Sequence, residues 1–219
     1  MENIINDLSQ ILFYAMTDVQ SLIKDYGEPY SRMLGINLRK GDPEYVKWLL
    51  ASILYAKPIR EESATKTYRE FESAGLTSAK SISEAEWDRL VRLLDKGGYT
   101  RYDFSTADRL LDVFDRLQRD YGGSLQRLYN SSSDGKDLKR RIMGLGKGIG
   151  PITVSIFLRD MQSVWPKAKP EPTKRIKKGM LAFGIRDLDK YASKNMLDPV
   201  ELATALHRYS RSLKKGTNS

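Results

Sequence analysis

The segment Leu138–Val154 constrains the fold of this chain more than any other stretch of its sequence. A short helical stretch is expected to end before Gly144, and glycine then occupies every second position up to Gly150. Pro151 follows directly, and proline is favoured at the first position of a helix. Because glycine accepts backbone conformations that other residues avoid, the segment predicts a tight hairpin between two helices.

The expected hairpin has the composition of a phosphate-binding turn. Backbone N–H groups of Gly146–Gly150 are expected to point outward, beside Lys147 and the positive end of the second helix. Such a turn holds phosphate without reading base sequence. A plain connection between two helices is the alternative interpretation of the same glycines.

Apolar residues recur every three to four positions along nearly the whole chain, and this period predicts an all-α protein. Ser83 and Glu86 are expected to form a capping box before a helix that begins near Trp87. The prolines of Trp165–Pro172 predict an irregular segment. The other expected helices cover approximately residues 4–23, 43–57, 61–72, 106–121, 173–183 and 199–213.

The charge of the chain favours a polyanionic partner. Its 219 residues include 37 lysines and arginines against 28 acidic residues, which gives a formal charge of +9. A basic surface of this kind is typical of nucleic-acid-binding proteins, although it also promotes solubility.

The residue types that are missing exclude several kinds of chemistry. With no cysteine, the chain cannot form disulfides, thiolate metal sites, iron–sulfur clusters or a cysteine nucleophile. A single histidine, His207, argues against a Ser-His-Asp triad. We therefore expect no cofactor and no bound metal. No apolar run reaches membrane length and no signal-peptide pattern opens the chain, so we expect a cytoplasmic, nucleoid-associated or nuclear protein.

Three segments together resemble the helix-hairpin-helix DNA glycosylase superfamily, the group of endonuclease III and alkyladenine glycosylase. Tyr45–Lys57 resembles the long apolar helix of that family, which ends in a DNA-inserting loop. Gly98–Leu111 resembles its passage of glycine, aromatic residue and helix, and Gly144–Val154 resembles the hairpin itself. The resemblance spans about residues 43–185. It implies two helical lobes, residues 43–164 and residues 1–42 with 165–219, with DNA in a cleft between them.

The chain departs from the family pattern at two catalytic positions. Bifunctional members carry a lysine two residues after the last hairpin glycine, where this chain has Ile152. The family aspartate, about twenty residues further on, corresponds to Pro172. The cysteine cluster found in some members is also absent. Ordinary family chemistry therefore does not transfer directly.

Lys57 is the leading candidate for a catalytic residue. The spacing of Val46, Leu50, Ile53 and Lys57 places the lysine on the apolar stripe of its helix. Apolar surroundings lower the pKa of an amine, and a neutral amine can form a Schiff base with the C1′ aldehyde of an abasic site. The alternative is a helix-end lysine that reaches solvent or binds phosphate.

Two carboxylates and several basic residues complete the candidate site. Glu171 is the acid nearest to the vacant aspartate position. Asp160 is an alternative carboxylate, unless it forms a surface or interlobe ion pair with Arg159. Lys147 is a second candidate nucleophile, ranked lower because the family nucleophile lies on the following helix. The candidate DNA-binding residues are Gly146, Lys147, Gly148, Gly150, Thr153, Lys167, Lys169 and Lys174.

These observations predict a base-excision-repair enzyme that acts as a monomer on duplex DNA with an abasic or damaged nucleotide. Strand cleavage by β-elimination needs chiefly an amine, so an abasic-site lyase, with or without glycosylase activity, is the favoured function. A monofunctional glycosylase that activates water through Glu171 or Asp160 is one alternative. A catalytically inactive protein that only binds damaged DNA is the other.

Overall fold

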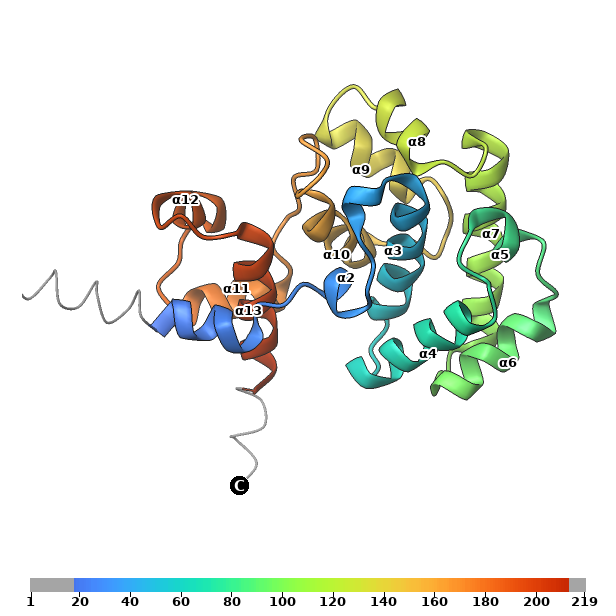
Figure 1. Cartoon of the computed structure of the whole chain (residues 1–219), viewed down its shortest axis with the longest axis horizontal. Coiled ribbons are helices and arrows are strands. Elements are labelled where there is room, and N and C mark those ends of the chain that lie inside the picture. Colours follow the sequence, from blue (N-terminus) through green and yellow to red (C-terminus); the bar gives the residue numbers. More distant parts are fainter. Residues whose placement is uncertain (1–17, 213–219) are drawn as a thin grey trace, which may run out of the picture. The chain divides into compact units, whose positions relative to one another are not determined.

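The computed structural model describes residues 18–212, which are helical with no strand among them (Figure 1). Within this range, no helix has both the length and the apolar character needed to cross a membrane. The all-α prediction is confirmed, while the predicted helical positions before residue 18 lie outside the described residues. Residues 18–26 are helical, followed by α2 (Tyr30–Met33), the 3-10 helix η1 (Leu38–Lys40), α3 (Asp42–Tyr55), α4 (Glu61–Ser73), α5 (Ala79–Ser83), α6 (Trp87–Gly97), α7 (Asp103–Tyr121), α8 (Leu125–Ser131), α9 (Gly135–Met143), α10 (Pro151–Met161), α11 (Lys174–Ala182), α12 (Leu188–Lys194) and α13 (Pro199–Ser212).

The chain forms two compact units, here called the central unit (residues 34–170) and the terminal unit (residues up to 33 and from 171). The expected lobe boundaries at 43 and 164 differ from these by several residues. At the first boundary, Leu38 is buried and η1 packs against α3. At the second, Trp165 stacks on Tyr129 with ring centroids 4.7 Å apart and meets Tyr45 edge-on at 5.2 Å.

Helix α3 runs through the core of the central unit. It is buried along most of its length because apolar side chains cover nearly its whole circumference. The buried Trp48 indole donates its Nε1 hydrogen to the Phe157 carbonyl at 3.0 Å, which joins α3 to α10. Since Tyr45 lies beside Trp165, the two helices are antiparallel, and the end of α3 lies beside the start of α10.

In the terminal unit, α11 and α13 approach closely at Gly179. A methyl group on this residue would lie 2.5 Å from the Leu206 carbonyl oxygen, well inside van der Waals contact. Around the crossing lies an apolar core that also includes residues of the helix at 18–26 and of α12.

Gly179→Ala is therefore expected to destabilise the protein by roughly 1–3 kcal/mol, the usual cost of overpacking, although alanine favours a helix more than glycine does. The measurement is the free energy of unfolding in urea. Lys177→Ala, on the exposed side of the same helix, is the matched control and should be nearly neutral. If Gly179→Ala unfolded at the same urea concentration as the wild type, α11 and α13 would not approach each other as closely as described.

The expected capping box at Ser83 and Glu86 is wrong. Ser83 ends α5, and α6 begins after Glu86 without a side-chain capping bond. The capping box lies earlier, where Ser78 and Ser81 each accept a hydrogen bond from the backbone N–H of the other. The short helices α5, α8 and α12 were not predicted, because five to seven residues contain too little periodic pattern.

Candidate nucleic-acid interface and lysine site

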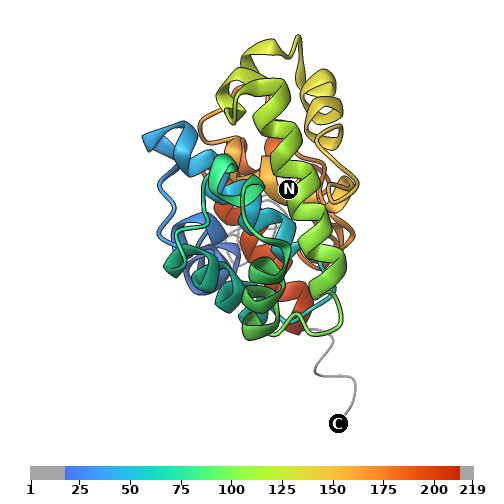
Figure 2. The same ribbon diagram turned by 90° about the vertical axis from the view of Figure 1, so that its right-hand side faces the viewer.

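The predicted hairpin joins α9 to α10 and rests on α7, the long helix in light green in Figure 2. The Asp112 carboxylate accepts a hydrogen bond from the Lys147 N–H at 3.3 Å. Arg116 donates its Nη1 hydrogen to the Gly144 carbonyl at 2.9 Å. The arrangement of helix, hairpin and helix is confirmed, and α7 supports it.

The hairpin glycines are needed for a different reason from the one expected. None of the four has a left-handed backbone conformation, and φ is −69° at Gly144 and −99° at Gly150. A methyl group at Gly146 would lie 2.6 Å from an Asp112 oxygen, and one at Gly148 would lie 2.9 Å from Arg109 Cβ. Two glycines therefore allow close packing on α7, whereas the Cα of Gly150 faces open space.

Only part of the hairpin backbone is available to a ligand. The Lys147 N–H is bound to Asp112, and the Ile149 N–H donates to the Gly146 carbonyl at 3.1 Å. Among residues 18–212, no acceptor meets the N–H groups of Gly148 and Gly150. These two groups, together with the unpaired first turn of α10, are suited to hold an anion.

Lys57 lies at the same end of the central unit as the hairpin. Trp48 of α3 pairs with Phe157 of α10, and the two helices are antiparallel. Lys57 comes nine residues after Trp48, and Gly148 comes nine residues before Phe157. The end of α3 lies beside the start of α10, so Lys57, two residues beyond α3, and Gly150, directly before α10, lie at the same level. Helix α3 ends at Tyr55, however, so Lys57 lies in the turn after the helix and not on its stripe as expected.

The environment of Lys57 favours its neutral form. The side chain is half-buried, and this burial lowers the pKa of the amine below its ordinary value. The positive charge of Arg109 lowers that pKa further. Arg109 also borders Gly148, so one arginine connects the lysine to the hairpin. At the family lysine position, Ile152 is an exposed apolar side chain.

Two candidate residues are buried away from any ligand. The Asp160 side chain is 1% exposed and accepts a hydrogen bond from Arg159 Nε at 2.9 Å. The ion pair with Arg159 is therefore present, but it is buried within the central unit and does not lie on the surface or between lobes as expected. A carboxylate enclosed in this way cannot contact a substrate. Thr153 is also buried, so its hydroxyl cannot reach a phosphate.

The remaining candidates differ in how accessible they are. The Lys167 ammonium donates to the Tyr129 and Ser132 carbonyls and lies 4.3 Å from the Tyr129 ring, so it holds the irregular segment in place. Lys147 and Lys169 are exposed in the central unit. Glu171 and Lys174 are exposed too, but belong to the terminal unit.

The polar face of α7 was not predicted from the sequence. Arg109, Asp112 and Arg116 follow one another at helical spacing and all meet the hairpin or Lys57. The same spacing is visible in the sequence, where it accompanies the apolar stripe of the helix. Nothing in the sequence indicated that this charged face meets a segment some 30 residues further on.

The described residues form an all-α fold with a glycine hairpin between two helices, supported by a third helix. A solved structure with this architecture is the H. pylori 3-methyladenine DNA glycosylase MagIII bound to 1,N6-ethenoadenine. It aligns with a TM-score of 0.54 and 16% sequence identity, over 94% of this chain and 99% of that chain. No family model matches the sequence, and no curated protein matches it significantly. The similarity confirms the predicted fold.

Proposed function

We propose that this protein is a DNA-repair enzyme that cleaves the strand at abasic sites through a Schiff base on Lys57. The observation that carries the proposal is a half-buried lysine with a lowered pKa at the level of the hairpin. The hairpin supplies free N–H groups for a DNA phosphate, and the lysine supplies an amine nearby whose pKa is below its ordinary value. Removal of a damaged nucleobase in addition to strand cleavage would need a second group, for which Glu171 is the candidate.

The chemistry requires few groups from the protein. The neutral amine adds to the C1′ aldehyde carbon of the ring-opened sugar, and loss of water forms the protonated imine. A base then removes a C2′ proton, and the electron pair expels the 3′ phosphate. Hydrolysis of the imine restores the lysine. Asp160 is enclosed in its ion pair, so Glu171 is the remaining candidate that the sequence offers for this base.

A passive DNA-binding protein is the second candidate function. It is favoured by Ile152 and Pro172, which occupy the positions of the family lysine and aspartate. A monofunctional glycosylase is less well supported, since a carboxylate must activate water and one of the two candidates, Asp160, is buried.

Borohydride trapping on abasic DNA separates these functions. The wild-type protein should give a covalent adduct with a duplex that contains one abasic site, and none with the undamaged duplex. Borohydride reduction joins the protein to the DNA only where an imine has formed, so a passive binder or a monofunctional glycosylase gives no adduct. Binding to the abasic duplex without any adduct or strand cleavage would overturn the lyase proposal.

Lys147→Ala is expected to weaken DNA binding while leaving turnover at saturating protein unchanged. The exposed Lys147 side chain adds a phosphate contact beside the hairpin, so its loss should reduce the salt dependence of log K by about one unit. Fluorescence anisotropy at several salt concentrations measures this slope, with Lys66→Ala on the exposed side of α4 as the control. Loss of trapping by Lys147→Ala at saturation would make Lys147 the nucleophile.

A further inference from the structure

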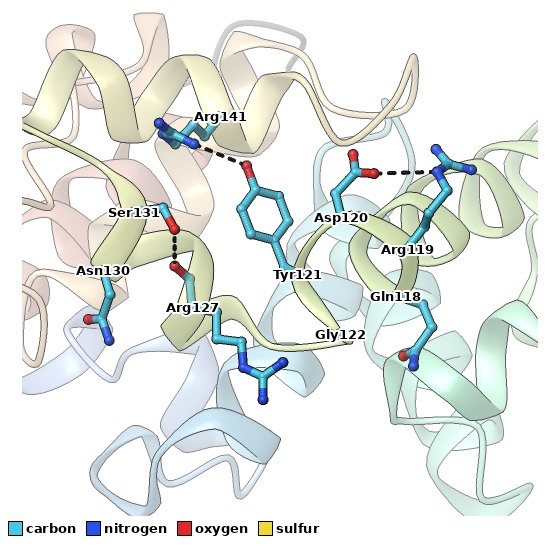
Figure 3. Close-up of a pocket in the computed structure, with 9 residues that line it drawn as sticks. All are labelled: Gln118, Arg119, Asp120, Tyr121, Gly122, Arg127, Asn130, Ser131 and Arg141. Carbon is cyan, nitrogen blue, oxygen red and sulfur yellow. Dashed lines mark hydrogen bonds and ion pairs between the residues drawn. The ribbon is translucent and has the colours of Figure 1, made fainter.

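A basic pocket of about 840 Å³ lies on the central unit between α7, α8 and α9 (Figure 3). Its walls carry three guanidinium groups, those of Arg119, Arg127 and Arg141, and a single carboxylate, that of Asp120. Hydroxyl and amide side chains complete the lining, so the pocket has the chemistry of an anion site.

Arg127 is the cation in this pocket that is available to a ligand. Arg119 pairs with Asp115 at 2.8 Å and with Asp120 at 3.3 Å, and Arg141 pairs with Asp137 at 2.9 Å. No carboxylate among residues 18–212 pairs with the exposed Arg127. Its planar fork of donors matches the oxygens of a phosphate.

The other side of the pocket is held in place by its own contacts. Arg141 and Tyr121 point toward one another, with Nη1 3.5 Å from the phenol oxygen (Figure 3). The Asp137 carboxylate accepts a hydrogen bond from Arg141 Nε and so holds the guanidinium in place. Arg140 and Arg141 in turn hold the pKa of Asp137 far below its usual value. Arg141 therefore keeps its orientation before any ligand arrives.

Three contacts place this pocket and the hairpin along the same helix. Asp112 meets Lys147, Arg116 meets Gly144, and Tyr121 meets Arg141, so α7 and the segment 141–147 run antiparallel. From Asp112 to Tyr121 the helix advances nine residues, which is about 13 Å. Along a duplex whose axis is parallel to α7, one strand carries a charge every 3.4 Å, so this span corresponds to about four phosphates.

We infer that the pocket at Arg127 and Arg141 binds a second backbone phosphate of the DNA duplex, about four nucleotides from the phosphate held by the hairpin. The inference rests on the proposed DNA binding but not on the lyase chemistry. A row of two phosphate sites on one helix fixes the direction of the strand along α7. It adds affinity without sequence preference, because the phosphate is the same at every step.

Arg127→Gln tests this site with little risk to the fold, because the side chain is exposed and makes no ion pair that the substitution would break. We expect the salt dependence of log K to fall by about one unit, and affinity at 0.15 M salt to fall about five-fold. Arg92→Gln, which removes an exposed charge from α6, is the matched control and should leave both values unchanged. An unchanged slope for Arg127→Gln would overturn the inference.

A scan of single methylphosphonate substitutions along the duplex locates the contacts directly, because each substitution removes one phosphate charge. For the wild-type protein we expect two sensitive regions on one strand, separated by about four nucleotides. Arg127→Gln should lose the second region and keep the first. A single sensitive region in the wild-type scan would contradict the proposed second site.

Two outcomes keep this inference distinct from the lyase proposal. If the wild-type protein gives no borohydride adduct but both sensitive regions persist, the lyase proposal fails and the phosphate site stands. A separate experiment measures the thermal unfolding of the protein with inorganic phosphate added at constant ionic strength. If free phosphate stabilises the wild type but not Arg127→Gln, while DNA binding is identical in both, the pocket serves a small phosphate compound and the DNA assignment is wrong.

Discussion

Lys57→Ala is expected to abolish borohydride trapping and strand cleavage at abasic sites. The substitution removes the amine at the level of the hairpin, and Ile152 cannot replace it. Since Lys57 lies in a turn after α3, the fold and most of the DNA affinity should persist. Adduct formation on a denaturing gel, with anisotropy on the same duplex, measures chemistry and binding separately.

Lys57→Arg should be equally inactive, because a guanidinium stays protonated and cannot add to an aldehyde. It retains the positive charge and is therefore the control for electrostatic binding. If Lys57→Ala gave a full yield of adduct, the nucleophile would be another lysine, with Lys147 or the exposed Lys169 the first to test.

The same lysine predicts the pH dependence of single-turnover cleavage. Only the neutral amine reacts, so the rate should rise with pH and level off above the pKa of Lys57. Because burial and Arg109 lower that pKa, the rise should come at lower pH than for an ordinary lysine. Arg109→Gln removes a neighbouring positive charge and should shift the rise to higher pH, whereas Arg92→Gln should not.

Gly150→Asp is expected to weaken binding to every duplex by roughly 30-fold, the equivalent of about 2 kcal/mol for a lost hydrogen bond to a charged group. A side chain at Gly150 would enter open space, and a carboxylate there repels the phosphate. Aspartate is nevertheless favoured at this position for the fold, because Gly150 is the N-cap of α10 and already has extended backbone angles.

Gly150→Asn is the matched variant for this experiment. Asparagine caps the helix as well as aspartate does but carries no charge, so it should bind DNA more tightly than Gly150→Asp. Thermal unfolding should show both variants at least as stable as the wild type. Gly148→Ala is less informative, since its methyl group meets Arg109 and disturbs the packing on α7. If Gly150→Asp bound DNA normally, the hairpin would be only a connection between helices.

Local features of the sequence determined the helices and the hairpin. The apolar period placed α3, α4 and α7, and Pro151 marked the start of α10 within one residue. The prolines after Trp165 correctly indicated an irregular segment. These signals act over a few neighbouring residues, because backbone propensity and helical spacing depend on the nearest turns of the chain.

Only the tertiary structure decided which polar side chains can meet a ligand. Asp160 and Thr153 appear in the sequence beside the hairpin, but packing of α10 against the core buries both. Conversely, α7 brings Arg109 to Lys57 across some 50 residues of sequence, and α8 places Arg127 in a pocket with the last residues of α7. Burial and charge pairing depend on contacts between distant segments, and no local pattern of residues records them.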